Sequence, residues 1–288
     1  MENIVSREEF KLDKKDFELL RKQIYRMCGL TISDGKEYLI LHRFKALYKS
    51  RNCRSWTDFY KLLVSGDMQF KEEAISAIST HETSFFRDNH PFTSIRNKVL
   101  PELLKSRRPG ADIKIWCAAS STGQEPYSLS MLIHEWTRTV GAGRISPADF
   151  SILATDISGA VIEKAKTGLF TNHEKSRGLP ATYDKYFDKV GGRWQVQPPV
   201  QSMVTFKKFN LLDSFRSLGQ FDFVMCRNVL IYFDDLTKVD IVHRIHDLLP
   251  DKGYLMLGST ETLAGHTDRF ATEHMGAVIL YRKMRGIK

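Results

Sequence analysis

The chain has 288 residues, of which 42% are hydrophobic, and a formal net charge of +9. This length suits one large domain or two modest ones, and the apolar content supports an ordinary core. No run approaches the roughly 18 apolar positions of a membrane-spanning helix, and the charged N-terminus lacks a signal-peptide core, so we expect a cytoplasmic protein without membrane insertion. The basic charge favours an acidic partner, whether nucleic acid, lipid or a carboxylate-rich protein.

The first 90 residues show helical periodicity. Apolar side chains recur three or four positions apart, for example at Phe17, Leu20 and Ile24, and no convincing strand interrupts them. Two serines are placed to start helices and two glycines to end them (Ser33 and Ser55, Gly29 and Gly66). We therefore predict an all-helical N-terminal domain over residues 1–90, followed by a linking helix over 91–110.

After residue 110, short apolar runs alternate with helical segments. This alternation predicts a doubly wound, mostly parallel sheet of the α/β class over residues 111–288. Strands are expected at Ile113–Cys117, Ser151–Thr155, Val204–Asn210, Phe221–Cys226, Tyr254–Gly258 and Ala277–Arg282. Because two of the four cysteines fall in these strands and no C-x-x-C pair is present, we expect reduced core thiols and no metal site.

An insertion at about residues 170–204 has a pattern of its own. Three aromatic residues have the spacing of a helix (Tyr183, Tyr186 and Phe187). Further on, Gly191 and Gly192 lie between alternating apolar residues, which is a hairpin signal. We predict a small β-rich lobe at the edge of the sheet.

The segment from Ile113 to Tyr127 is typical of a nucleotide site, because an apolar strand leads through small residues into a helix start. Only Gly123 of the G-x-G-x-x-G pattern is present, so we expect an adenosine without phosphates, as in S-adenosylmethionine, rather than a dinucleotide. The next strand ends on Asp156, which is either an acceptor for the ribose diol or the N-cap of a following helix.

A third polar site follows the apolar run that begins at Phe221. Arg227, Asn228 and Tyr232 lie there among apolar residues, at the strand end where open α/β sheets bind ligands. Buried polar groups are costly unless they are paired or used. These residues are therefore candidates for a functional site.

Five ordered motifs carry a family resemblance over nearly the whole chain. They are the segments Ser79 to Arg87, Ala118 to Ser128, Ala154 to Ile157, Asn210 to Leu212 and Cys226 to Phe233. With these motifs the chain resembles the CheR-type chemotaxis receptor glutamate methyltransferases. The resemblance implies a helical N-terminal domain, a class I S-adenosylmethionine-dependent methyltransferase domain with a Rossmann-like fold, and a small inserted β-subdomain.

The resemblance also implies a reaction. Members transfer the methyl group of S-adenosylmethionine to glutamate side chains on the cytoplasmic helices of chemoreceptors, which yields glutamate methyl esters and S-adenosylhomocysteine during chemotactic adaptation. Matched by motif, the cofactor contacts are Thr83, Arg87, Glu125, Asp156, Asn210, Leu211, Asn228 and Val229. His81 stands where the family often has Asn, and we weigh a cofactor contact against a buried structural histidine.

Methyl transfer to a carboxylate requires no general base, because glutamate is already ionised at neutral pH. The protein must instead align the reacting atoms and remove water. Arg87 is the candidate for orienting a carboxylate by a bidentate hydrogen bond. Tyr232 is the candidate for positioning the acceptor, and its alternative interpretation is a core aromatic with a satisfied hydroxyl.

A basic segment in the N-terminal domain is the predicted receptor-docking surface. Its cations Arg43, Lys45, Lys49 and Arg51 are interleaved with apolar residues, which on a helix separates a buried from a cationic face. The alternative is a solvated helix face that binds no partner. The glutamate-rich receptor helices implied by the resemblance favour docking.

Two other functions compete with this interpretation. A nucleic-acid methyltransferase would suit the positive charge, but no aromatic Pro-Pro element for a flipped base follows the third strand motif. A non-catalytic S-adenosylmethionine-binding regulatory module is the second alternative. Some family members also hold a C-terminal receptor peptide on the β-subdomain, but the hairpin here is short, so we expect weak or no binding of such a tether.

Overall fold

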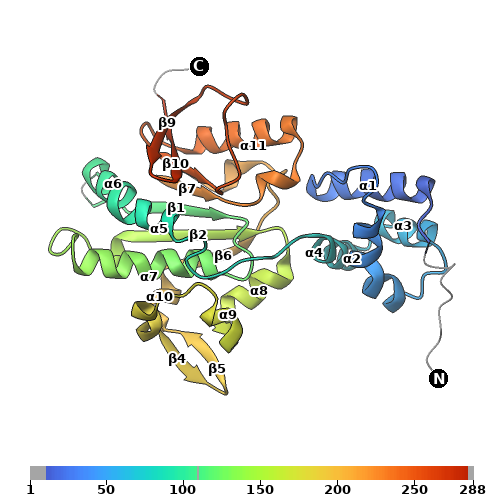
Figure 1. Ribbon diagram of the computed structural model, residues 1–288, viewed down its shortest axis with the longest axis horizontal. Helices are drawn as coiled ribbons and strands as arrows, with labels where there is room; N and C mark the ends of the chain where they lie inside the picture. Colours follow the sequence, from blue (N-terminus) through green and yellow to red (C-terminus); the bar gives the residue numbers. More distant parts are fainter. Residues whose placement is uncertain (1–10, 109, 285–288) are drawn as a thin grey trace.

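The computed structural model describes residues 11–108 and 110–284 (Figure 1). Its N-terminal part is a bundle of helices that lies beside a larger α/β domain, as predicted. The bundle consists of α1 (Lys14–Cys28), α2 (Glu37–Ser50), α3 (Trp56–Val64) and α4 (Met68–Ile78). A core of buried apolar side chains from all four helices holds it together, with Phe17, Phe44 and Phe59 among them.

Local capping explains several of the helix ends. Ser55 caps α3 by accepting from the N–H of Asp58, as predicted, and Gly29 ends α1 in the left-handed conformation with φ +74°. The prediction for Ser33 was wrong. Helix α2 begins later, after Lys36, whose side chain makes no capping hydrogen bond.

Residues 79–89 connect the bundle to the α/β domain, and the predicted linking helix that follows them is nearly continuous and packs into the core of the α/β domain (Figure 1). It consists of α5 (His90–Ser94), a π-helical segment η1 (Ile95–Val99) and α6 (Leu100–Ser106). Pro101 lies at its centre and has no N–H to donate to the preceding turn. The wider π turn just before it accommodates this missing hydrogen bond without ending the helix.

The sheet of the α/β domain has the strand order β6-β2-β1-β7-β8-β10-β9. Pairing is parallel from β6 through β8, and β10 is antiparallel to both neighbours. The strands are β1 (Ile113–Ala118), β2 (Phe150–Asp156), β6 (Val204–Lys208), β7 (Phe223–Cys226), β8 (Tyr254–Leu257), β9 (Phe270–Met275) and β10 (Val278–Lys283). The predicted doubly wound α/β class is confirmed, although edge strand β9 was not anticipated.

Helices cover both faces of the sheet (Figure 1). Alternate side chains of β1 show the division, since Ile115 joins the core beneath α7 and Trp116 joins the core beneath α11. The covering helices include α7 (Gln124–Arg138), α8 (Gly159–Thr167) and α11 (Asp235–Leu248). None of the helices within the described residues has the length and apolar character needed to cross a bilayer.

The inserted segment forms a three-stranded sheet with the order β3-β5-β4. Its strands are β3 (Leu169–Phe170), β4 (Phe187–Val190) and β5 (Arg193–Val196), and it also holds α9 (Asn172–Ser176) and α10 (Pro198–Ser202). Gly191 and Gly192 form the tight hairpin turn, both with positive φ. The expected aromatic helix is instead a 3-10 helix, Ala181–Tyr186, and Phe187 already belongs to β4.

Candidate functional site

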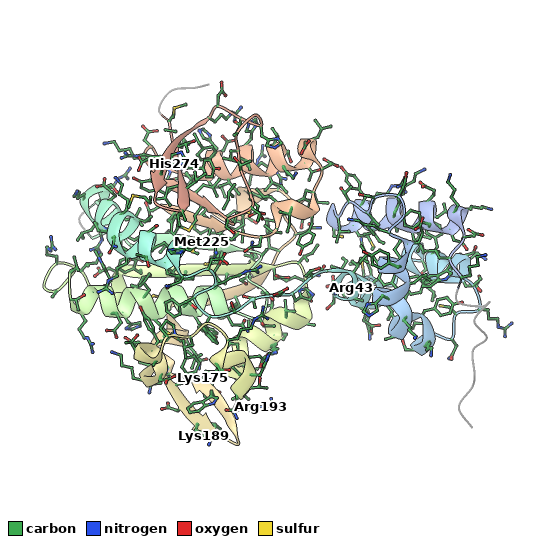
Figure 2. All side chains as sticks on the ribbon, in the orientation of Figure 1. Arg43, Lys175, Lys189, Arg193, Met225 and His274 are labelled. Carbon is green, nitrogen blue, oxygen red and sulfur yellow. The ribbon has the colours of Figure 1, made fainter. Side chains whose placement is uncertain are left out.

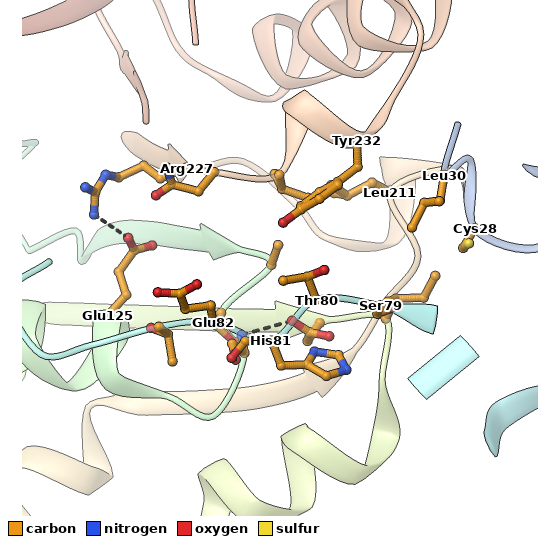
Figure 3. A pocket seen from close by; sticks show the side chains of 18 of the residues that line it. Cys28, Leu30, Ser79, Thr80, His81, Glu82, Glu125, Leu211, Arg227 and Tyr232 are labelled. Carbon is orange, nitrogen blue, oxygen red and sulfur yellow. Dashed lines mark hydrogen bonds and ion pairs between the residues drawn. The ribbon is translucent and has the colours of Figure 1, made fainter. Parts of the chain in front are cut away.

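An open cavity of about 960 Å³, including its solvent-filled mouth, lies at the carboxyl ends of β1, β2 and β7 (Figure 3). Every residue expected to contact the cofactor or act in catalysis lines this cavity: His81, Thr83, Arg87, Glu125, Asp156, Asn210, Leu211, Asn228, Val229 and Tyr232. The helical domain contributes Cys28 and Leu30, which sequence reasoning missed. The cavity therefore lies between the two domains.

The loop after β1 shapes the back of the cavity. Ala119, Ser121 and Gly123 all have positive φ, so the backbone turns sharply before α7 begins. A Cβ on Gly123 would come within 3.2 Å of Phe206 and Tyr127 ring atoms, which explains a glycine at this position. The turn directs the N–H of Ser121 to the carboxylate of Asp156, at 2.9 Å.

Asp156 is a buried carboxylate at the end of β2. One oxygen accepts from the N–H of Ser121 and the other from the N–H of Ser158, at 3.0 Å. Burial raises the pKa of Asp156, and the hydrogen bond from Ser158 and the charge of His81 act in the opposite direction. The N-cap of α8 is Ser158, so Asp156 is not that N-cap. Each carboxylate oxygen retains a lone pair that a ribose hydroxyl can use.

Glu125 lies in the first turn of α7 and is paired with Arg227 (Figure 3). The Arg227 side chain is only 1% exposed and donates to Glu125 and Asp88, both at 2.8 Å. Burial raises the pKa of Glu125, and the Arg227 charge opposes this shift. A negative charge in the first turn of α7 would repel a phosphate at this helix N-terminus, so this site suits an adenosine without a pyrophosphate.

His81 faces the cavity but its ring is held by the backbone. Nε2 donates to the carbonyl of Ser76 in the last turn of α4, at 3.1 Å, and the His81 carbonyl accepts from the Ser121 hydroxyl, at 2.8 Å. The ring thus provides a hydrogen-bond donor for a carbonyl group at the end of α4. This geometry favours the structural interpretation of His81 over a direct hydrogen bond to a cofactor.

Arg87 and Tyr232 are half-buried and approach the cavity from different segments. Nη1 of Arg87 donates to the carbonyl of Glu82, at 3.0 Å, which leaves the other nitrogens of its guanidinium for a ligand. Among the described residues, no partner lies within hydrogen-bonding distance of the Tyr232 hydroxyl, and Figure 3 shows this side chain reaching into the cavity. The structure therefore does not favour the alternative interpretation of Tyr232 as a core aromatic residue with a hydrogen-bonded hydroxyl.

Asn210 and Tyr232 also tie the helical domain to the cavity. Nδ2 of Asn210 donates to the carbonyl of Met27, at 2.9 Å, and the N–H of Thr31 donates to the carbonyl of Tyr232, at 2.9 Å. Leu211, next to Asn210, is buried against the cavity wall. These hydrogen bonds join the end of α1 to the loops after β6 and β7.

The predicted basic surface does not form one cationic face. Arg43 donates to the carbonyl of Ser79 and the hydroxyl of Thr80, at 3.3 and 3.1 Å, and lies on the side of the bundle that faces the α/β domain (Figure 2).

Arg51 lies beyond the end of α2, where it pairs with Glu73 at 2.8 Å and stacks over the ring of Phe70. Two of the four predicted cations thus secure α2 against α4 and the residues 79–80 that follow it. Lys45 and Lys49 remain exposed, and they share one helical stripe with the exposed Tyr38 and His42.

All four cysteines are free, and burial raises the pKa of the Cys28 thiol at the cavity wall to about 11. This thiol donates to the carbonyl of Ile24 and remains protonated at neutral pH. Within residues 11–108 and 110–284, no group of three or more histidine, cysteine or acidic side chains is placed to hold a metal ion.

Comparison with known proteins identifies two family domains in this order. Residues 15–79 match the all-alpha domain of the CheR methyltransferases, and residues 81–279 match the SAM-binding domain of the same family.

Three relatives carry related names. The chain is 41% identical to chemotaxis protein methyltransferase 1 of Pseudomonas aeruginosa, over 93% of this chain and 97% of that protein. It is 40% identical to chemotaxis protein methyltransferase Cher2 of Pseudomonas putida, with the same coverage. It is 39% identical to the chemotaxis protein methyltransferase of Vibrio parahaemolyticus, over 88% of this chain and 92% of that protein.

Proposed function

Since the chain belongs to the CheR methyltransferase family and is an S-adenosylmethionine-dependent methyltransferase, we propose that it methylates glutamate side chains on the cytoplasmic helices of chemoreceptors. The product would be a glutamate methyl ester formed during chemotactic adaptation in the cytoplasm. The observation that carries the proposal is the cavity between the two domains. The acidic residues Glu125 and Asp156 line it together with Arg87 and Tyr232.

The cavity suits the cationic cofactor. Glu125 and Asp156 place two carboxylates on its wall, and Leu211, Val229 and Ile157 supply apolar surface for an adenine ring. When bound, S-adenosylmethionine supplies an electrophilic methyl group on a sulfonium centre. In our assignment Asp156 accepts from the ribose diol, and Glu125 and Arg87 hold the charged groups of the methionyl end.

The acceptor step needs alignment rather than proton transfer. A glutamate oxygen forms the new bond to the methyl carbon as the bond from that carbon to sulfur breaks, and no proton leaves the acceptor. In our assignment the Tyr232 hydroxyl donates to the acceptor carboxylate and fixes its approach. Positioning of this kind can contribute roughly 7–11 kcal/mol to rate acceleration.

The helical domain is our candidate for receptor docking. The chain that leaves its last helix lines the cavity at residues 79–83, so a partner bound to this domain would be held close to the reacting atoms. We now assign the docking stripe to Tyr38, His42, Lys45 and Lys49 of α2, which are all exposed. Exposed lysines would attract a glutamate-rich helix mainly during encounter.

We do not expect the inserted lobe to add strong receptor affinity. Strand β4 lies at the edge of the small sheet and offers four residues, Phe187–Val190, for pairing with a peptide. So short an edge provides few hydrogen bonds and few side-chain pockets. Titration of a free C-terminal receptor peptide should give no saturation at micromolar concentration, and micromolar binding that maps to β4 would contradict this expectation.

One assay separates the proposal from its alternatives. Purified protein is incubated with a methyl-labelled donor and either a receptor cytoplasmic fragment or duplex and single-stranded nucleic acid. We expect alkali-labile label on the receptor fragment alone, because a glutamate methyl ester hydrolyses in base. Label on nucleic acid would establish the first alternative, and cofactor binding without transfer to any substrate would favour the regulatory module.

A further inference from the structure

A buried carboxylate outside all five sequence motifs holds the turn that carries Tyr232. Glu261 lies in the loop after β8, and its carboxylate accepts five backbone N–H groups. Oε2 accepts from Gly258 and Asn228, both at 2.7 Å. Oε1 accepts from three consecutive residues, Val229, Leu230 and Ile231, at 3.0, 2.7 and 3.3 Å.

The turn needs such an acceptor because its first N–H groups have no partner within it, whereas the N–H of Tyr232 donates to the carbonyl of Val229. Residues 230–232 form a 3-10 helix, η5 (Leu230–Tyr232), and the first N–H groups of any helix lack an internal acceptor. Asn228, with φ +57°, directs its own N–H toward the same point. Successive N–H groups that converge in this way form a concave site for an anion, and here the Glu261 carboxylate fills it.

The local sequence around Gly258 makes room for this arrangement. A Cβ at Gly258 would lie 2.7 Å from both Nδ2 of Asn228 and Oε2 of Glu261. Only glycine therefore lets the end of β8 approach the turn closely enough for the shared hydrogen bonds. Two segments that are 30 residues apart are thus built around one carboxylate.

The same turn forms part of the cavity wall. Asn228, Val229 and Tyr232 line the cavity, and Arg227 begins the turn with its ion pair to Glu125. Glu261 acts from behind the wall and does not line the cavity among the described residues. Its position between the turn and β8 therefore couples the sheet to the residues that face the cofactor.

We propose that Glu261 is a positioning residue for methyl transfer, which holds the Asn228–Tyr232 turn in the geometry that binds the cofactor and presents Tyr232. The proposal rests on the proposed function only in placing the acceptor beside Tyr232. Its effect on the cofactor is independent of which acceptor is used.

Glu261→Gln is the appropriate variant, because it keeps the shape but offers only one carbonyl oxygen. Its amide nitrogen must face either two or three N–H donors, whichever way the group is turned. We expect the Kd for S-adenosylhomocysteine to rise about tenfold or more, since one unsatisfied buried N–H is enough for roughly that factor. Hydrogen exchange of the amides of residues 228–231 should accelerate, while exchange in α4 stays at the parent rate.

Glu273→Gln provides the matched control. Glu273 is a half-buried carboxylate that is paired with Arg282 at 3.1 Å, and it lies on edge strand β9 and does not line the cavity. Both variants are compared well below their melting temperatures. Any difference in cofactor affinity then reflects the geometry of the Asn228–Tyr232 turn and not unfolding of the protein.

Two results would overturn the proposal. Unchanged exchange at 228–231 in Glu261→Gln would show that the carboxylate does not hold the turn. Accelerated exchange with parent affinity and parent kcat would show that the order of the turn is irrelevant to function. The measurements of cofactor affinity and of hydrogen exchange do not involve an acceptor. A wrong assignment of the chemoreceptor would therefore leave these two readouts intact.

Discussion

Removal of the Arg227 guanidinium tests how the buried charges at the cavity are stabilised. Arg227→Met keeps much of the side-chain volume but leaves Glu125 and Asp88 without their shared cation, which lies 2.8 Å from each in the native protein. Loss of one partner of a buried ion pair costs about 3–5 kcal/mol, because the remaining charge stays desolvated. This is a large fraction of a total stability of about 5–15 kcal/mol.

The expected shift in melting temperature follows from this free energy. With about 2–4 °C per kcal/mol for a domain of this size, the variant should melt roughly 6–20 °C below the parent. Differential scanning calorimetry measures this directly. Arg138→Met is the control, since Arg138 pairs with Glu135 on the exposed side of α7 and its loss should change stability by less than about 1 kcal/mol.

The loss of stability in Arg227→Met should also depend on pH. Burial raises the pKa of Glu125 in the folded protein, and loss of Arg227 removes the main opposing influence. An acid whose folded pKa is raised destabilises the folded state above its unfolded pKa, and this destabilisation is relieved as pH falls through the folded pKa. The stability gap between Arg227→Met and the parent should therefore narrow from pH 8 to pH 5. A gap that is small at pH 8, or that widens as pH falls, would refute this account.

Three further changes test other parts of the molecule. Asp156→Asn should raise the calorimetric Kd for S-adenosylhomocysteine by about tenfold, since hydrogen bonds to a charged acceptor contribute roughly 1.5–3 kcal/mol, and parent affinity would contradict the ribose assignment. Charge reversal of Lys45 and Lys49 should slow receptor methylation at low salt and leave cofactor affinity unchanged, and equal rates would exclude the docking stripe. Gly178→Ala should lower the melting temperature more than Gly192→Ala, because both glycines have positive φ but only at Gly178 would a Cβ clash with the carbonyl oxygen of Phe85.

The fold was predictable because its signals are local. Helical spacing of apolar residues identified the bundle, and short apolar runs identified the central strands, whose side chains are buried on both faces. Strand β9 was missed for the corresponding reason. It lies at the sheet edge, most of its side chains are at least partly exposed, and its sequence Phe-Ala-Thr-Glu-His-Met carries no long apolar run.

The cavity residues were predictable in identity but not in their partners. Parallel strands end at one edge of a sheet, so polar residues after β1, β2 and β7 necessarily meet there. The ion pairs of the predicted basic surface were not predictable, because the partner of Arg51 is Glu73, on another helix. Glu261 was missed because an acidic residue in an irregular loop has no periodic pattern that marks its five N–H donors.

The two domains meet at the cavity through hydrogen bonds and not only through a linker. The carbonyl of Met27 and the N–H of Thr31 bind loops of the α/β domain on either side of Gly29, where a Cβ would lie 2.8 Å from the ring of Phe233. This close approach places Cys28 and Leu30 in the cavity wall. The helical domain therefore contributes to the wall of the proposed cofactor site, and in our proposal it also carries the docking surface. If the receptor docks on α2 as we propose, the same contact between the domains that encloses the cofactor would also align the acceptor with it.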